Sequence, residues 1–439
     1  MLYHIHAPRV FLSFDMISKE RFNEELLAFI NNSPTAFHVV RNIERELLSA
    51  GFERLAESDQ WKIKRAGKYF ITRNASSIIA FSTGADDSSG FRIIGAHTDS
   101  PSLKIKPDPL YIEEPYIQLG VEVYGGALLK TWFDRELSIA GRVTCLGTDD
   151  TILSVLVDFK RPIAIIPSLA AHLGNAAAPF NAQKELPAII GQKHGRKTID
   201  FKKMLQEQVE SEHAAVVKTA LDHELFLYDC ASAAFFGLEN EFIAGSRLDN
   251  LISCFICLKA AQKSGDEPAY IIVLNDHEEA GNTSFHGAGG SFLRDILTRL
   301  YPSSGEHQRI TRSSMILSLD NAHGAHPNYP ETHEARHKVE INNGPAIKIN
   351  ASQRYSTNSE TAAEFRAIAL RLGINIQNFV MRSDMQGGTT IGPISSASTG
   401  IAALDAGAPS LAMHSIRETA GTEDAHALFK IAIEFLKGK

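Results

Sequence analysis

Four side chains that can bind a metal or carry a proton follow one hydrophobic run near the middle of the chain. Residues 271–274 read Ile-Ile-Val-Leu, which is typical of a buried strand, and Asp276, His277, Glu278 and Glu279 come just after it. Ligands of open α/β sheets bind beyond the carboxyl ends of the strands, so we expect a site here. Neighbouring side chains diverge, so one glutamate can bind a cation while the other serves as general base for a water molecule. A solvated charged turn is the alternative for this segment taken alone.

Three further strand-like runs end on residues of the same kind. Residues 91–96 lead to His97, residues 315–319 lead to Asp320, and residues 409–413 lead to His414. Asp99 lies two residues after His97, where its carboxylate could orient the imidazole and fix its tautomer. Each histidine taken singly is more often structural. Several strands that end this way in one chain favour a shared site.

Asp249 adds a carboxylate at the start of an apolar helix that we predict from residue 251 onward. It is either the N-cap of that helix or a metal ligand. Histidine and carboxylate ligands without a thiolate, with one aspartate shared between two cations, suit zinc-like ions that keep open positions for water and substrate. We therefore predict a dinuclear metal site. Cys254 and Cys257 form a C-x-x-C pair inside the helix, and they fit buried hydrophobic positions better than a redox or zinc pair.

Composition narrows the class of protein. The chain has 439 residues, 44% of them hydrophobic and 22% charged, which fits a globular protein of two or three domains. The net charge of -7 argues against nucleic acid or an anionic membrane as the main partner. No run reaches membrane-spanning length, and the first residues lack the pattern of a signal peptide. The 4 cysteines are too few for a disulfide scaffold, so we expect a cytoplasmic protein.

The pattern of predicted helices and strands changes twice along the sequence. Helical periodicity and strand-like runs occupy residues 1–102, and short strands with turn signals dominate residues 103–238. The mixture of helical periodicity and strand-like runs returns over residues 239–439. We predict a domain in two parts, interrupted by an inserted β-rich domain. Within the insertion, residues 174–197 are rich in Ala and Gly without periodicity, which predicts a long loop.

The motifs together resemble those of the aspartyl aminopeptidases, a family of cocatalytic zinc metallopeptidases. Seven segments carry the resemblance in the family's order and span nearly the whole chain: Gly95-Ala-His-Thr-Asp-Ser-Pro, Arg247-Leu-Asp-Asn, Asp276-His-Glu-Glu-Ala-Gly, Asp320-Asn-Ala-His-Gly-Ala-His-Pro-Asn-Tyr, Gln353-Arg-Tyr-Ser-Thr-Asn, Gly388-Thr-Thr-Ile-Gly-Pro and Met413-His-Ser-Ile-Arg-Glu. The chain departs from the family by having Ala-Gly-Asn at residues 280–282 in place of Val-Gly-Ser. It also has Met-Gln-Gly at residues 385–387, where many relatives carry a cysteine. Neither departure touches a proposed ligand.

The resemblance implies a fold and a set of site residues. The fold class is α/β: a mixed-sheet zinc-peptidase catalytic domain, a phosphorylase/hydrolase-like α/β/α sandwich, interrupted by a β-rich, barrel-like assembly domain. Two Zn2+ ions are implied per subunit, with Mn2+ or Co2+ possible in one position. The implied ligands are His97, Asp249, Glu279, Asp320 and His414, with Asp249 as the bridge. Glu278 is implied as the general base, and Asp99 as the support of His97.

The resemblance also implies an activity and partners. Peptides are the expected substrates, and their amino-terminal residue, with Asp or Glu preferred, is removed. Lys348 would pair with that acidic side chain, whereas the residues alone also allow an exposed strand lysine. Relatives form closed homo-oligomers, typically of twelve chains, in which His172 reaches a neighbour's active site. From the residues alone, His172 is a surface or packing histidine.

Two other functions stay open at the level of the sequence. A dinuclear metal amidohydrolase acting on N-acyl amino acids would cut a substrate with a blocked amine faster than one with a free amine. A non-catalytic, metal-stabilised assembly protein would have no use for Glu278, because a structural site needs no spare base.

Overall fold

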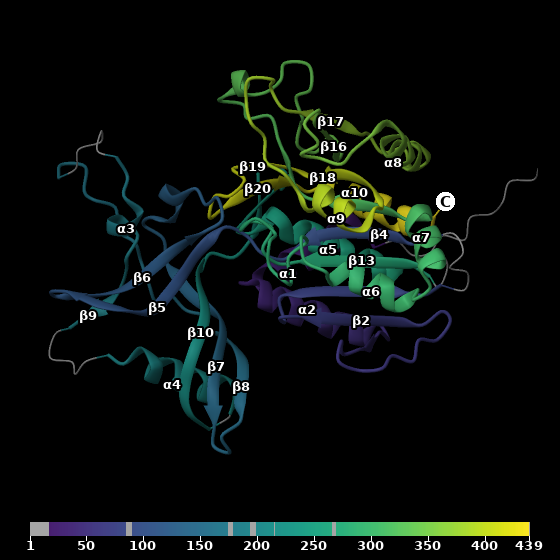
Figure 1. Ribbon diagram of the computed structural model, residues 1–439. Coiled ribbons are helices and arrows are strands. Elements are labelled where there is room, and N and C mark those ends of the chain that lie inside the picture. The colour runs from purple at the N-terminus through teal and green to yellow at the C-terminus, as the bar shows by residue number, and fades with distance from the viewer. Residues whose placement is uncertain are drawn as a thin grey trace, which may run out of the picture.

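The chain folds around a mixed nine-stranded sheet (Figure 1). The computed structural model describes residues 17–84, 90–173, 179–193, 199–214, 216–265 and 269–438. The strand order is β1-β2-β3-β13-β4-β14-β18-β16-β17. These strands are β1 (Glu53–Arg54), β2 (Lys68–Arg73), β3 (Ser77–Ser82), β4 (Arg92–His97), β13 (Tyr270–Asn275), β14 (Met315–Leu319), β16 (Ala346–Ile349), β17 (Gln377–Val380) and β18 (Ala402–Gly407).

Three central strands of this sheet run parallel and end at one edge. Strand β4 pairs with β13 on one side and with β14 on the other. Asn275 lies opposite His97, and Ser318 lies opposite Gly95. The polar residues that follow β13 and β14 therefore emerge beside His97, as the sequence predicts.

Helices cover both faces of the sheet, because successive strand residues point to opposite faces. Ile272 and Leu274 of β13 belong to one hydrophobic core, and Ile271 and Val273 belong to another. The first core is completed by α1 (Lys19–Asn31), α2 (Ala36–Ser49), α5 (Leu248–Lys263), α8 (Ser359–Leu372) and α10 (Asp424–Leu436). The second contains residues of α6 (Phe292–Leu300) and α7 (Ser304–Ser313), and α9 (Ile391–Thr399) contacts α6, β4, β14 and β18.

Helix α5 shows why the C-x-x-C pair is not a metal or redox site. Nearly all its residues are buried, because it packs between the sheet and α1, α2 and α10. Cys254 and Cys257 are fully buried free thiols within it. The interpretation of both cysteines as small hydrophobic residues is consistent with this position.

A six-stranded sheet, ordered β8-β7-β10-β5-β6-β9, projects to one side of the molecule (Figure 1). Its strands come from one continuous part of the chain: β5 (Ser102–Glu113), β6 (Tyr116–Tyr124), β7 (Leu137–Gly147), β8 (Ile152–Asp158), β9 (Ala188–Gln192) and β10 (Val217–Asp229). Helix α4 (Phe201–His213) packs Leu205 and Val209 into the core of this sheet. A short 3-10 helix, Leu129–Trp132, lies between β6 and β7.

Two expectations for this part of the chain need correction. The barrel is not confirmed: single bridges from Ala164 and Ile165 reach β7 and β9, but no continuous strand closes the sheet within the described ranges. The single long loop over residues 174–197 is wrong for residues 182–192, where α3 (Ala182–Glu185) and β9 form. Strand β9 pairs with β6, and this long-range pairing leaves no periodic signal in a short segment. Residues 174–178 and 194–198 lie outside the described residues.

A third sheet of five strands holds the segment before His414. Its order is β11-β12-β20-β19-β15. The strands are β11 (Ala234–Phe236), β12 (Phe242–Gly245), β15 (Ala322–His323), β19 (Pro409–Leu411) and β20 (Glu418–Gly421), and a 3-10 helix spans Pro330–Thr332. The strand predicted before His414 exists, but it belongs to this sheet and not to the edge formed by β4, β13 and β14. None of the described helices is both long and apolar enough to cross a membrane.

Candidate metal centre

Two histidines and three carboxylates converge beyond the ends of β4, β13 and β14. Nε2 of His97 lies 3.4 Å from Oδ1 of Asp249 and 3.7 Å from Oδ1 of Asp320. Nε2 of His414 lies 3.2 Å from Oε1 of Glu279 and 3.6 Å from Oδ2 of Asp249. Asp249 therefore turns one oxygen toward each histidine. We call these five residues the candidate metal centre.

The spacing of these atoms fits metal ligands. Nitrogen and oxygen ligands at the usual distances from a tetrahedral zinc ion lie about 3.3–3.6 Å from one another. The ligand atoms of His97, Asp249 and Asp320 lie within 4.8 Å of one another, and so do those of Asp249, Glu279 and His414. Oδ1 of Asp249 is also buried without a hydrogen-bond partner among the described residues. A cation would satisfy such an atom, and imidazole with carboxylate is a donor set that suits zinc.

The backbone around Asp249 rules against a capping role for its side chain. Helix α5 is kinked near its start, where Asp249 and Asn250 have non-helical backbone angles, and Oδ1 of Asp249 accepts no hydrogen bond from a helix N–H among the described residues. The backbone N–H of Asp249 donates to Oε2 of Glu418 at 2.9 Å, which fixes the backbone, and the Asp249 carboxylate faces the two histidines. Its carboxylate is therefore placed as a ligand would be, and not as a helix cap.

Asp99 organises the loop that carries the paired glutamates. Its Oδ1 accepts the backbone N–H of Glu278 at 3.2 Å, and its Oδ2 accepts that of Glu279 at 3.1 Å. The hydroxyl of Tyr124 donates to Oδ2 at 2.7 Å. Nδ1 of His97 donates to the main-chain oxygen of Asp99 at 3.0 Å and lies 3.4 Å from its Oδ1. The expected support of His97 thus comes first from the Asp99 carbonyl, while the carboxylate fixes the glutamate loop.

The centre concentrates negative charge in a buried place. Burial opposes charge on His414, but Glu279 and Asp249 outweigh it and raise its pKa to about 9. The pKa of His97 also lies well above its usual range, because Asp249, Asp320 and Asp99 together outweigh burial. The carboxylates thus favour the protonated, positively charged form of both imidazoles. A divalent cation can supply that charge in place of the protons.

Glu278 stands beside this centre with a perturbed carboxyl group. Its ligand atom lies within 4.8 Å of those of His97 and Glu279. Burial raises the pKa of Glu278 to about 8; His97 lowers it, and the carboxylates of Asp320, Glu279 and Asp99 raise it. The deprotonated form of a carboxyl group with a raised pKa is a stronger base than an ordinary carboxylate, which suits a general base.

Comparison with known proteins decides the family. A family model described as "Aminopeptidase I zinc metalloprotease (M18)" matches residues 29–436. This chain belongs to the M18 family. It is a metalloaminopeptidase, a hydrolase that acts on peptide bonds and uses a metal cofactor. The resemblance to zinc aminopeptidases is therefore confirmed, and the amidohydrolase and the non-catalytic assembly protein are not favoured.

Individual M18 relatives match over nearly their whole length. A probable M18 family aminopeptidase 2 of Pseudomonas savastanoi pv. phaseolicola is 47% identical over 422 residues, which cover 95% of this chain and 98% of the relative. A chain in the cryo-EM structure of the Ape4 and Nbr1 complex is 35% identical with a TM-score of 0.91, over 96% of this chain and 86% of that one. The S. cerevesiae mApe1 dodecamer is 26% identical with a TM-score of 0.81, over 95% and 96%.

The side chain of Lys348 is buried in this M18 aminopeptidase and does not lie on an exposed strand face. Its side chain is buried in β16, and its Nζ donates to Oδ2 of Asp320 at 2.9 Å. Burial raises the pKa of Asp320 and the positive Lys348 and His97 lower it, with the net result below its usual range. The alternative of an exposed lysine is wrong.

His172 stands apart from the other predicted residues of the M18 site. It lies exposed in a turn at residues 171–173 of the part of the chain that forms the six-stranded sheet. It belongs to none of the metal-capable groups found among the described residues. Within one chain, therefore, nothing places His172 beside the candidate metal centre.

Sequence reasoning missed two residues that hold the M18 site together. Tyr124 of β6 donates to Asp99, and Glu418 of β20 binds two backbone groups. Oε2 of Glu418 accepts the N–H of Asp249, and its Oε1 accepts the N–H of His414 at 2.8 Å. Glu418 lies within the Met413-His-Ser-Ile-Arg-Glu motif, so its proximity to His414 was a usable signal. No local signal marks Tyr124.

Proposed function

We propose that this aminopeptidase uses two zinc ions, held by His97, Asp249, Glu279, Asp320 and His414, to remove amino-terminal Asp or Glu from peptides. The observation that carries the proposal is the placement of Asp249, whose Oδ1 faces His97 and whose Oδ2 faces His414. When bound, the ions would polarise the first peptide carbonyl and hold the free α-amine, with Mn2+ or Co2+ possible in one position. A requirement for a free amine would make the enzyme an exopeptidase.

Glu278 acts in this proposal as the general base. It takes the proton of the attacking water and returns it to the leaving amine. Asp99 keeps the Glu278 backbone in place, and Nδ1 of His97 donates to the Asp99 carbonyl, so Nε2 of His97 is free to face a cation.

Glu278 and Glu279 offer a matched test of these roles, because they are adjacent and take the same substitution. Glu278→Gln keeps the bound zinc and loses nearly all turnover, since an amide cannot accept the water's proton. Glu279→Gln loses zinc, since it removes a charged ligand. Zinc content per chain and kcat/KM are measured on both. High turnover in Glu278→Gln would assign the base to another residue.

Lys348 supports the preference for acidic residues, because it is a buried cation at the edge of the candidate metal centre. Lys348→Ala lowers cleavage of amino-terminal Asp and Glu relative to Leu and Ala by about 2–4 kcal/mol in transition-state free energy. Lys348 also pairs with Asp320, so its loss affects all substrates to some extent. Only the ratio of kcat/KM values between acidic and apolar substrates tests specificity, and an unchanged ratio refutes this role.

We also propose that residues 103–238 form an inserted assembly domain between catalytic parts 1–102 and 239–439. The chain resembles one in a structure described as a dodecamer, which supports a homo-oligomer, and twelve subunits is the size that we propose. His172 is exposed in the inserted part, as a residue that reaches a neighbour's site must be. There it would donate a hydrogen bond to the substrate or its developing oxyanion.

Complementation tests this assembly. His172→Ala and Glu278→Gln chains are each nearly inactive alone, and co-expression restores activity, because a chain with intact Glu278 receives His172 from a neighbour. Mixed oligomers are verified by two affinity tags. If mixed oligomers form and activity stays at the level of the separate variants, His172 does not act across the interface.

A further inference from the structure

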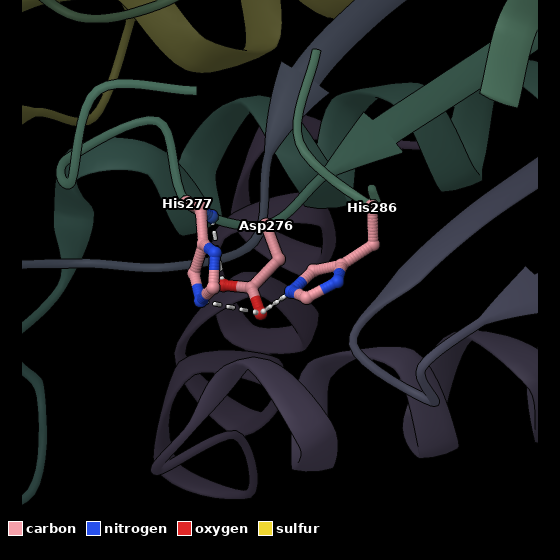
Figure 2. Close-up of side chains that lie close together, drawn as sticks. All are labelled: Asp276, His277 and His286. Carbon is pink, nitrogen blue, oxygen red and sulfur yellow. Dashed lines mark hydrogen bonds and ion pairs between the residues drawn. The ribbon is translucent and has the colours of Figure 1, made fainter. Parts of the chain in front are cut away.

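We propose that Asp276, His277 and His286 bind an additional divalent cation, separate from the candidate metal centre. We call these residues the Asp276 cluster. Asp276 and His277 follow β13, and His286 comes from the segment that leads to α6. Figure 2 shows both imidazole rings turned toward the Asp276 carboxylate. None of the three is a ligand in the proposed peptidase site.

The spacing within the cluster is that of metal ligands. Oδ2 of Asp276 lies 3.5 Å from Nε2 of His286 and 3.7 Å from Nε2 of His277, and the three ligand atoms lie within 4.8 Å of one another. N–H···O hydrogen bonds measure about 2.7–3.2 Å, so both distances are too long for good hydrogen bonds. They are close to the separations at the candidate metal centre, where Nε2 of His97 lies 3.4 Å from Oδ1 of Asp249 and 3.7 Å from Oδ1 of Asp320.

One local hydrogen bond orients the Asp276 carboxylate, and the ring nitrogens of His286 have few polar contacts. Oδ1 of Asp276 accepts the backbone N–H of His277 at 2.9 Å, so Oδ2 is the oxygen that faces the rings. His286 is only 5% exposed, and its Nδ1 is buried with no hydrogen-bond partner among the described residues. Nε2 of His286 has one further polar contact, with Nδ2 of Asn74 at 3.5 Å. Both polar contacts of Nε2 of His286 are therefore 3.5 Å long, and an ion bound between Nε2 and Oδ2 of Asp276 would replace them with short ligand bonds.

The cluster is accessible and selects a class of cation. Asp276 and His277 line a cavity of about 60 Å³ together with Thr98, Asp99 and Tyr124, and the His277 side chain is about one-third exposed. A water molecule from this cavity can supply a fourth ligand. Two imidazole nitrogens and one carboxylate oxygen suit Zn2+ and similar borderline ions, whereas Mg2+ and Ca2+ prefer oxygen ligands.

Without an ion, the same residues would form an ordinary packing arrangement. The ring centroids of His277 and His286 lie 4.4 Å apart, and the rings of Phe285 and His286 form an edge-to-face pair with centroids 4.6 Å apart. In that case, Asp276 would simply accept weak hydrogen bonds from the rings. The two arrangements differ in the amount of zinc that the protein binds.

Zinc content tests the proposal on the full-length protein. Wild type, His286→Asn and the control His307→Asn are equilibrated with zinc at one buffered free concentration and analysed for metal per folded chain. His307 lies in α7 and belongs to no metal-capable group among the described residues. His286→Asn should hold about one zinc ion fewer than the other two proteins, since a three-ligand site loses a ligand. Equal zinc content in all three proteins overturns the proposal.

A second measurement needs no substitution in the cluster. Anomalous diffraction at the zinc edge from wild-type crystals should show a peak between Oδ2 of Asp276 and the two Nε2 atoms. A filled candidate metal centre without this peak overturns the proposal. Glu279→Gln crystals separate it from the proposed function: the peak at the Asp276 cluster persists even where zinc at the candidate metal centre is lost.

Discussion

Asp99→Asn is the substitution that most directly tests how the glutamate loop is held. The Asp99 carboxylate accepts the N–H of Glu278 on Oδ1, and the N–H of Glu279 and the Tyr124 hydroxyl on Oδ2. Burial raises the pKa of Asp99, but His97 and the donated hydrogen bonds outweigh it, so the carboxyl is ionised at neutral pH. Asparagine keeps the shape and loses the charge and one acceptor.

The cost of Asp99→Asn follows from the two orientations that the introduced amide group can take. If its NH2 group takes the place of Oδ2, Tyr124 can turn and accept, but the N–H of Glu279 faces another donor. In the opposite orientation, the N–H of Glu278 loses its acceptor. Either way one backbone N–H in the loop is left unpaired, which costs about 1–3 kcal/mol. At about 1.4 kcal/mol per tenfold, zinc affinity or kcat/KM falls by about 10- to 100-fold, the range typical of residues that support metal ligands.

Tyr124→Phe is the matched control, because it removes one donor from Oδ2 and leaves both backbone hydrogen bonds of Asp99 in place. Its expected cost is about 0.5–1.5 kcal/mol. Zinc affinity is measured by competition with a chelator, and kcat/KM with a peptide that carries amino-terminal Asp. If Asp99→Asn loses no more than Tyr124→Phe in either quantity, Asp99 does not act through the two backbone N–H groups.

Two further predictions concern Glu418 and His38. Glu418→Ala leaves the backbone N–H groups of Asp249 and His414 without their acceptor, and chelator competition should show zinc affinity lower by about 10- to 100-fold. Burial lowers the pKa of His38 to about 3, and its Nδ1 bonds to the hydroxyl of Thr35. As pH falls from 6.5 toward 3, the unfolded chain binds a proton at His38 that the folded chain excludes, so the contribution of His38 to stability falls by about 2 kcal/mol between pH 7 and pH 5. Urea unfolding of wild type and His38→Gln at both pH values should show a loss smaller by about 2 kcal/mol in His38→Gln, and equal losses contradict the reasoning.

The parts of the site that the sequence predicts are those with a local signal. An apolar run followed at once by His97, by Glu278 and Glu279, or by Asp320 marks both a strand and the edge where it ends. The structure places β4, β13 and β14 side by side, so these residues meet. The run before His414 and the helix start at Asp249 added these two residues to the set, and Oδ1 of Asp249, which accepts no hydrogen bond among the described residues, argues against the helix cap that local reasoning left open.

What the sequence does not predict depends on long-range contacts. The strand before His414 lies in the five-stranded sheet, because β19 pairs with β15 and β20 and not with the central strands. The hydroxyl of Tyr124 is 25 residues from Asp99 along the chain, and the carboxylate of Glu418 is 169 residues from Asp249. Glu418 binds backbone N–H groups, which every residue except proline carries, so no residue type reveals its partners.

The part of the chain that forms the six-stranded sheet also contributes to the candidate metal centre. Tyr124 ends β6 and donates to Asp99, and the carbonyl of Gly126, two residues later, lies 3.1 Å from Nδ1 of His414. A carbonyl can only accept, so Nδ1 of His414 carries the proton and Nε2 is left to face Asp249 and Glu279. The tautomer of one proposed ligand and the position of the glutamate loop therefore both depend on residues 124–126. If this part of the chain serves assembly, as we propose, a shift of β6 would disturb the contacts that orient His414 and the loop that holds Glu278.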